Sequence, residues 1–316
     1  MGLDKTKGQS MIEKLISEAI SEFVWHCRYE KSLNEKTICA YETDLKQFEE
    51  LSSVNNLADV EKMHIQIWLK AISIFKHKTV KRKLATLKCF FSYIELENDW
   101  FNNPLRRMSI KMKESSSLPT VMTIEEIRTI LTIVYQKARN GKGQQNYLGI
   151  RNSAIIELLF ATGIRVDELC KLKNEDVNLI SGFIKIHGKG NRDRVVAICQ
   201  EETITALQKW SNKKNTDSPV FFTNRLNRPI SPQNIRQMIH GIVSESNIQK
   251  SITPHTFRHT FATLLLEEDV DIRYIQQILG HSSIKTTEIY THVTTRKQRE
   301  ILLSKHPRMK VKPYWV

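Results

Sequence analysis

The sequence has little that would suit an exported, membrane-spanning or disulfide-stabilised protein. No apolar run reaches the roughly 18 residues of a membrane-spanning helix, and no signal-peptide pattern opens the chain. The five cysteines are odd in number, scattered and never spaced as C-x-x-C, which indicates free thiols and argues against a disulfide framework or a cysteine-based zinc site. We therefore expect a soluble, cytoplasmic protein.

Acidic residues are too few to balance the basic ones. The chain of 316 residues has 48 Lys and Arg against 34 Asp and Glu, a formal net charge of +14. Residues 1–118 hold 19 basic and 16 acidic residues, whereas the remainder holds 29 and 18, so most of the excess lies in the second part. This charge favours a polyanionic partner, although a basic surface that serves only solubility explains it equally well.

The first third of the chain is patterned as successive amphipathic helices. Apolar residues recur at helical spacing in four stretches, which are residues 11–28, 34–48, 59–72 and 79–97. Asn34 is suited to cap the second of these helices. We expect a flexible start over residues 1–10, followed by a four-helix domain over residues 11–104.

Basic side chains crowd the fourth expected helix and the segment that follows it. About half or more of protein–DNA hydrogen bonds go to the phosphate and sugar backbone, which suits lysine and arginine on one helical face, although such a run is more often a solvated face. Residues 105–118 also contain three successive serines and resemble a flexible basic linker. The candidate DNA-binding residues are Lys76, Lys78, Lys81, Arg82, Lys83, Lys88, Arg106, Arg107 and Lys111.

The second part is patterned as a mixed helical domain over residues 119–294. Thr123 and Glu126 have the spacing of a capping box at the start of a helix. The one clear β signal is a hairpin of Phe183–His187 and Arg194–Ile198 across a glycine-containing turn. The fold class expected for the whole chain is therefore mainly α with a small antiparallel sheet (α+β).

Four short segments of this second part carry the residues that phosphodiester chemistry requires. They are Ala161–Leu169, Thr253–Thr263, Leu279–Ser283 and Ile289–His292. Together they contain two arginines and several histidines that can bind a phosphate, and a tyrosine whose phenol can attack it. Such chemistry needs stabilisation of a charged transition state, a nucleophile and an acid for the departing oxygen.

These segments resemble the motifs of the tyrosine recombinase (phage integrase) family, especially its two-domain Xer-type and integron-type members. The resemblance runs from about residue 11 to about residue 300, and it includes Tyr41 and Phe48 in a pattern typical of the family's SAM-like core-binding domain. It implies a catalytic domain over residues 119–294. The catalytic residues that it implies are Arg165, Lys189, His255, Arg258, His281 and Tyr290.

The resemblance implies roles for the basic residues. Arg165 and Arg258 would bind the non-bridging oxygens of the scissile phosphate, since a guanidinium stays charged and can grip two oxygens. Lys189, at the tip of the hairpin, would protonate the 5′ oxygen, although a glycine-flanked lysine is often only a solvated turn. Glu168 would support the site by orienting basic side chains, and an exposed helix acid is nearly as good an interpretation.

The histidines and the tyrosine complete the set. His255 would accept or relay the proton of the nucleophile, His281 would donate a hydrogen bond to the phosphate, and Tyr290 would attack it. His259 is interpreted as structural. The spacing of His255 and His259 also resembles half of a zinc motif, but Thr256 stands where that motif has glutamate, so no metal is expected.

The expected function is site-specific recombination through a 3′-phosphotyrosine intermediate, without metal, ATP or cofactor, in integration or excision of a mobile element or in Xer-type resolution. A type IB topoisomerase-like enzyme and a DNA-binding relative that no longer cuts are the alternatives. The expected partner is double-stranded DNA with inverted half-sites, because the core-binding pattern starts near residue 11 and leaves no room for a further arm-binding domain.

The resemblance also implies how the protein assembles. We expect a homotetramer on two DNA duplexes in the nucleoid, with a second recombinase or an accessory protein as a further candidate partner. Residues 295–316 form a tail with a short helix that carries few apolar residues and must pack on something. We expect the tail to dock on a neighbouring protomer, and packing on its own domain is the alternative.

Overall fold

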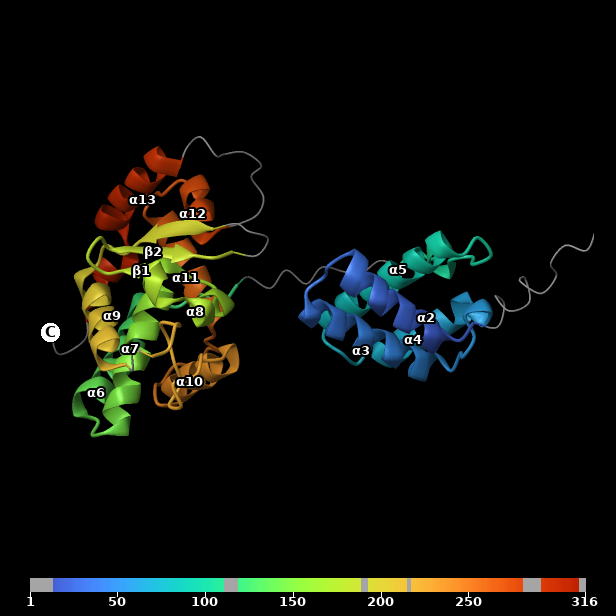
Figure 1. Cartoon of the computed structure of the whole chain (residues 1–316), viewed down its shortest axis with the longest axis horizontal. Helices are drawn as coiled ribbons and strands as arrows, with labels where there is room; N and C mark the ends of the chain where they lie inside the picture. Colours follow the sequence, from blue (N-terminus) through green and yellow to red (C-terminus); the bar gives the residue numbers. More distant parts are fainter. Residues whose placement is uncertain (1–13, 111–118, 189–192, 215–216, 281–290, 313–316) are drawn as a thin grey trace, which may run out of the picture. The chain divides into compact units, whose positions relative to one another are not determined.

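The computed structural model describes residues 14–110, 119–188, 193–214, 217–280 and 291–312, with side chains from residue 298 onward in the last of these ranges. The chain divides into two compact units, Met1–Ser117 and Leu118–Val316 (Figure 1). No helix of the described part is long and apolar enough to cross a membrane.

The first unit is helical throughout its described residues, 14–110. Its elements are α2 (Ile16–Trp25), η1 (His26–Glu30), α3 (Glu35–Ser52), η2 (Leu57–Asp59), α4 (Lys62–Ile72), α5 (His77–Glu97) and η3 (Pro104–Arg107). The Asn34 side chain accepts a hydrogen bond from the Lys36 backbone at 2.9 Å and caps α3 as expected. Phe48 packs edge-on against Trp68 and Phe91, with ring centroids 5.6 and 5.7 Å apart. The predicted four-helix domain is confirmed.

A buried ion pair ties α3 to α5 inside this unit. The Asp44 carboxylate is 1% exposed and accepts from Lys83 Nζ at 2.8 Å and from the Thr86 hydroxyl at 3.1 Å, and it also pairs with Arg82. Burying one charge without the other is costly, so this pair holds the two helices in register. Lys83 is therefore buried in an ion pair inside the unit. The expectation that it contacts DNA phosphate is corrected accordingly.

The second unit surrounds one central helix. Its elements are α6 (Ile124–Asn140), α7 (Gln144–Thr162), α8 (Val166–Lys171), η4 (Asn174–Asp176), β1 (Val177–Asn178), β2 (Phe183–Ile186), β3 (Arg194–Ala197), α9 (Glu201–Lys213), α10 (Pro232–Ser244), α11 (Pro254–Glu267), α12 (Ile272–Leu279), α13 (Thr291–Lys305) and η5 (Pro307–Lys310). The predicted capping box starts α6, because Thr123 and Glu126 exchange side-chain to backbone hydrogen bonds at 2.7 and 3.2 Å. α7 is buried on all sides over residues 153–162 and lies against α6, α9 and α11 (Figure 1).

The predicted hairpin forms part of a small sheet. Strands β1, β2 and β3 are antiparallel in that order, and Ile184 pairs with Val196 across the β2–β3 ladder. Ile184, Ile186 and Val196 face the core, so alternate side chains of these strands anchor the sheet on the helices. A mainly helical chain with a small antiparallel sheet is therefore the confirmed fold class.

The last described residues of the chain, 298–312, pack on the second unit itself. Leu302 and Val311 are fully buried, and the Gln200 side chain donates to the Leu302 carbonyl at 2.7 Å. The Arg308 guanidinium reaches Glu157 of α7 at 2.9 Å. Residues 298–312 therefore have partners within their own unit, and docking of the tail on a neighbouring protomer stays a prediction.

Candidate active site

Arg258 is held at the start of α11. Thr253 caps this helix by accepting from the Thr256 backbone at 3.3 Å, which orients its first turns. The Arg258 side chain is only 6% exposed, and its Nη1 and Nη2 donate to the carbonyls of Gly163 and Leu279 at 2.8 and 2.7 Å. Two carbonyls thus fix the plane of this guanidinium, and within the described residues it donates to no carboxylate.

Arg165 lies at the N-terminal end of α8, one turn after α7 ends. Its Nη1 donates to Glu168 at 2.9 Å and its Nη2 to the Gly280 carbonyl at 3.1 Å. Gly163 has a positive φ of 58°, and a Cβ there would lie 2.6 Å from Leu279 and 2.9 Å from Phe261. Glycine at this turn therefore permits both the left-handed backbone and the close packing that brings Arg165 to the end of α12.

A third arginine, Arg194 of β3, joins them and was missed in the sequence. Its Nη1 and Nη2 donate to the two carboxylate oxygens of Glu168 at 3.1 and 2.7 Å, and its Nε donates to the Ile278 carbonyl at 3.0 Å. The only sequence signal was an arginine at the start of an otherwise apolar strand. Glu168 thus contacts two arginine side chains, and its expected role in orienting basic side chains at the site stays a prediction.

Three successive carbonyls at the end of α12 organise these arginines. The carbonyls of Ile278, Leu279 and Gly280 each accept one hydrogen bond, from Arg194, Arg258 and Arg165 in that order. The C-terminal end of a helix carries partial negative charge, which favours cations there. The arginines therefore converge at the point where the chain continues into His281.

The charges of the three arginines and Glu168 do not cancel, so the cluster keeps a net positive charge. Burial, followed by the charges of Arg165 and Arg194, lowers the pKa of Arg258 to about 10. Burial alone would raise the pKa of Glu168, but hydrogen bonds and charge from Arg194, and then from Arg165, hold that pKa below its usual value. In the described part of this site, three guanidiniums share one ionised carboxylate, an arrangement suited to an anion.

His255 and His259 lie on α11 with Arg258. Both histidines are exposed, and His255 precedes Arg258 by three residues, so the two lie on neighbouring turns of one face. Burial lowers the pKa of His259, and the charges of His255 and Arg258 lower it further. Within the ranges that the structure describes, no group of three or more His, Cys, Asp or Glu could hold a metal ion.

Four expected residues lie outside the described residues: Lys189, His281, Tyr290 and Lys111. The segments beside the first three are described. His187 Nδ1 lies 2.9 Å from a carboxylate oxygen of Asp193, and His187 Nε2 lies 2.9 Å from one of Asp176. These contacts connect the end of β2 to the residue before β3.

The basic residues expected to bind DNA differ in exposure. Lys76, Lys78, Lys81, Lys88 and Arg107 are exposed. Arg82 is also exposed although it pairs with Asp44, and Arg106 pairs with Glu95 at 2.9 Å with 72% of its side chain exposed. These residues, unlike Lys83, present charge at the surface of the first unit.

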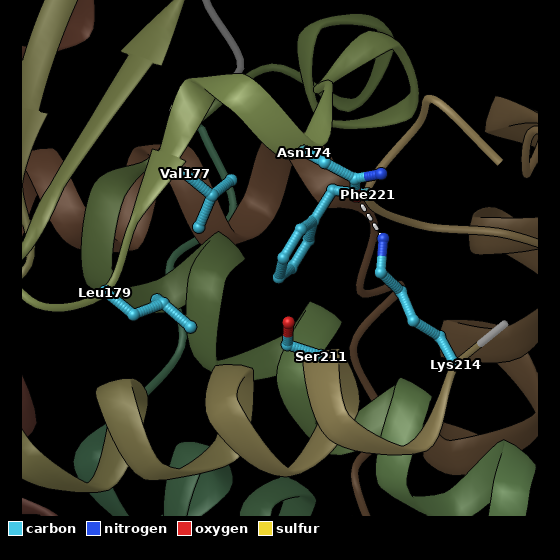
Figure 2. Close-up of a pocket in the computed structure, with 6 residues that line it drawn as sticks. All are labelled: Asn174, Val177, Leu179, Ser211, Lys214 and Phe221. Atoms are coloured by element: carbon cyan, nitrogen blue, oxygen red, sulfur yellow. Dashed lines mark hydrogen bonds between the residues drawn. The ribbon is translucent and has the colours of Figure 1, made fainter. Parts of the chain in front are cut away.

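A cavity of about 250 Å³ lies elsewhere in the second unit (Figure 2). Figure 2 shows the Lys214 side chain directed toward Asn174, to whose amide oxygen its ammonium donates, and this ammonium lies 4.8 Å from the Phe221 ring centroid. The remaining lining residues are Val177, Leu179 and Ser211. None of the residues expected to act on DNA lines this cavity.

Both units of the chain are similar to known protein families. The model of the phage integrase family matches residues 120–297, and that of the phage integrase N-terminal SAM-like domain matches residues 20–98. A tyrosine recombinase of Agathobacter rectalis is 42% identical over 92% of this chain and 96% of its own length. Tyrosine recombinase XerD of Staphylococcus haemolyticus is 34% identical over 92% of this chain and 98% of its own length.

Solved structures share the fold at lower identity. XerH site-specific recombinase bound to a palindromic difH substrate has a TM-score of 0.69 at 23% identity, over 94% of this chain and 88% of that one. A lambda integrase tetramer bound to a Holliday junction has the same TM-score at 18% identity, over 91% of this chain and 84% of that one.

Proposed function

The chain belongs to the phage integrase family and is a tyrosine recombinase, an enzyme that breaks and rejoins DNA, and we propose that it acts through Tyr290 at a specific DNA site. The observation that carries this assignment is the convergence of Arg165 and Arg258 on the carbonyls of Gly280 and Leu279. That convergence leaves cationic groups, fixed in place, next to the segment that contains His281. Preorganised charge of this kind stabilises a pentavalent phosphate without reorganisation during the reaction.

The reaction follows from the roles of the side chains. Tyr290 Oη attacks the phosphorus of the scissile phosphate while His255 accepts the phenolic proton. Arg165 and Arg258 hold the non-bridging oxygens, and the bond from phosphorus to the 5′ oxygen breaks as Lys189 donates a proton to that oxygen. The products are a 3′-phosphotyrosine and a free 5′ hydroxyl. Because the phosphoester is conserved, attack by another 5′ hydroxyl reverses the steps and rejoins DNA without ATP or metal.

His281 completes the phosphate site by donating a hydrogen bond to a non-bridging oxygen. Its neighbour Gly280 ends α12 in the left-handed conformation, with φ 66°, and accepts from Arg165. His281 directly follows Gly280 in the chain, which supports its assignment to the same phosphate as Arg165.

The two units divide the work on DNA. We propose that residues 11–104 bind DNA as a core-binding domain through exposed basic residues of α5 and η3, and that residues 105–118 link it to the catalytic domain. Matches of the two family models to residues 20–98 and 120–297 support this division. We further propose a cytoplasmic homotetramer that acts on inverted half-sites of two duplexes, as lambda integrase forms a tetramer on a Holliday junction.

Covalent capture on DNA of random sequence tests the proposal and identifies the site. The full chain is incubated with nicked duplexes that carry a randomised segment, and strands that remain attached to protein after denaturation are sequenced. We expect attached strands that share a half-site, with the nucleotide on the Tyr290 peptide in mass spectrometry. Tyr290→Phe should still shift the captured duplex in a native gel but form no adduct, whereas Tyr274→Phe, the matched control in α12, should form it.

The same assay distinguishes the alternatives. Adducts with Tyr290→Phe, or none with the unaltered chain, would overturn the proposal. Adducts without a shared sequence, together with relaxation of any supercoiled plasmid, would identify a topoisomerase-like enzyme instead.

A further inference from the structure

We propose that Arg194 is a positioning residue of the strand-cleavage reaction, which binds Glu168 so that the charge of Arg165 remains available to the phosphate. The inference rests on the proposed function, because it assigns to Arg194 a task in the phosphate site described above. Arg194 itself is nearly enclosed, with 10% of its side chain exposed, so it acts through Arg165 and not on the DNA.

The division of hydrogen bonds around Glu168 carries the proposal. The Arg194 guanidinium binds both carboxylate oxygens, at 3.1 and 2.7 Å, whereas the Arg165 guanidinium binds only one, at 2.9 Å. The other oxygen accepts from the Arg165 backbone N–H at 3.0 Å, a contact that uses none of the guanidinium's charge. A bidentate arginine–carboxylate pair is the stronger and more directional of the two arrangements. Glu168 is therefore satisfied mainly by Arg194, and the outward part of Arg165, whose side chain is 39% exposed, keeps its charge.

Removing Arg194 would reverse this division. The Glu168 side chain is 8% exposed, and a carboxylate so enclosed must keep a cationic partner. In the described part of the site, Arg165 is the partner already in contact, and it would turn its second nitrogen toward the carboxylate. A scissile phosphate would then compete with Glu168 for the same guanidinium.

Arg194 also joins two segments that each lead to a catalytic residue. It begins β3, five residues after Lys189 in the chain, and its Nε donates to the Ile278 carbonyl at the end of α12. A Cβ added to Gly280 would lie 2.9 Å from its Nη1 and 3.1 Å from its Cδ, so its guanidinium packs on the backbone next to His281.

A charge-restoring double variant separates this role from a merely structural one. The full-length variants are Arg194→Gln, Glu168→Gln and the two combined, with Arg194→Lys as the conservative change. For each, the rate of adduct formation in a single turnover is measured on the captured nicked half-site duplex, alongside half-site affinity at fixed salt and the midpoint of thermal unfolding.

We expect Arg194→Gln to slow adduct formation roughly 100-fold, the scale of one lost electrostatic contact to a transition state, with affinity changed less than about threefold. Adding Glu168→Gln should recover roughly tenfold, because the competing carboxylate is gone, and Arg194→Lys should lie between Arg194→Gln and the unaltered chain. Glu168→Gln alone should slow the reaction less than Arg194→Gln does.

Other outcomes overturn the inference. A wild-type rate in Arg194→Gln would show that Arg165 needs no such protection. A slow double variant, with losses that follow the unfolding midpoint, would show that Arg194 only holds the fold. No adduct with the unaltered chain would instead remove the proposed function itself, so the two failures are distinguishable.

Discussion

Two arginine clusters in the second unit differ in how completely their charge is neutralised. In the tail cluster, Arg308 and Glu157 are both fully buried and face each other with three nitrogen–oxygen contacts of 2.9 to 3.2 Å. Tyr135 and Thr203 donate further hydrogen bonds to the same carboxylate at 2.7 and 3.0 Å. In the described part of the site cluster, Arg165 and Arg194 share the Glu168 carboxylate, and Arg258 donates only to carbonyls.

The comparison separates structural arginine from functional arginine by charge balance. The Arg308 guanidinium faces Glu157 directly, and its Nη1 also lies 3.8 Å from a Glu202 carboxylate oxygen, so no positive charge is left over. The tail cluster therefore joins residues 151 positions apart and offers no cation to a ligand. Carbonyls orient a guanidinium without cancelling its charge. The arginines of the site cluster are therefore held by hydrogen bonds, as Arg308 is, but the cluster remains cationic. Its ordering is local to the ends of α7 and α12, where the DNA phosphate is proposed to bind.

Arg308→Met should have the largest effect, and it should be on stability. The variant leaves the Glu157 charge buried without its counter-ion, which costs about 3–5 kcal/mol of unfolding free energy. Denaturant unfolding, with hydrogen exchange of α7 and α13 as the local probe, measures this. The matched variant Arg308→Met with Glu157→Gln should recover part of the loss, and equal losses in the two would contradict the pairing.

Arg258→Lys should show the opposite profile, a loss in chemistry larger than its loss in stability. Lysine cannot bridge the Gly163 and Leu279 carbonyls as a planar fork does, so the cation loses its fixed position. We expect adduct formation on the captured duplex to fall about 10²–10³-fold, which corresponds to roughly 3–4 kcal/mol, with half-site binding nearly retained. If stability falls as far as in Arg308→Met, the two clusters are not functionally different.

The tail cluster should also loosen in acid through His306. Its Nε2 lies 2.9 Å from the Ala161 carbonyl and its Nδ1 accepts the Arg308 backbone N–H at 2.9 Å, so the enclosed ring is neutral, and burial lowers its pKa to about 4. Because the unfolded chain, with a pKa near 6.5, binds the proton more readily, stability is complete above about pH 6.5. It is lost as pH falls toward 4, by at most about 3 kcal/mol.

Hydrogen exchange of residues 298–312 between pH 7 and 4.5, corrected for intrinsic rates, tests this pH dependence. Exchange should become faster in acid in the unaltered chain, and this dependence should be flatter in His306→Gln, which cannot titrate. The same pH dependence in both proteins would show that another group is responsible.

The smallest effect is expected for an exposed lysine of the first unit. There, too, charged residues that are exposed differ from one that is buried in an ion pair. Exposed Lys78→Ala should weaken DNA binding by less than about 1 kcal/mol and lower the slope of log affinity against log salt by about 1. Lys83→Met should leave that slope unchanged and destabilise the unit, because Asp44 loses its buried partner. Equal salt slopes for both variants would mean that exposure does not decide which lysines meet phosphate.

The sequence predicted those elements whose determinants are close together in the chain. Thr123 and Glu126 cap α6 because both hydrogen bonds close within one turn, and the β2–β3 hairpin follows from two apolar runs across a short connection. The segments with Arg165 and Arg258 were identifiable because the residues that make up each motif are close together in the sequence. These features depend on local geometry, which a pattern can carry.

Other features depend on which helix faces meet, and local patterns do not encode that. Lys83 was grouped with the exposed lysines because helical spacing places it beside them, yet its ammonium turns to Asp44, 39 residues earlier. The few apolar residues of the tail helix indicated only that it must pack on something. They gave no sign that Arg308 supplies the counter-ion that Glu157 of α7 needs.

The sequence by itself therefore indicated the chemistry of this protein. Its two arginine motifs predict side chains that stabilise a phosphate, and its tyrosine motif predicts the nucleophile that attacks it. Only the tertiary structure decided the charge balance of the site. Arg194 lies 26 residues after Glu168 and 84 before Ile278, and packing of β3 against the end of α12 brings the three together. Charge balance is a property of groups within a few ångströms, and those distances exist only once the chain has folded.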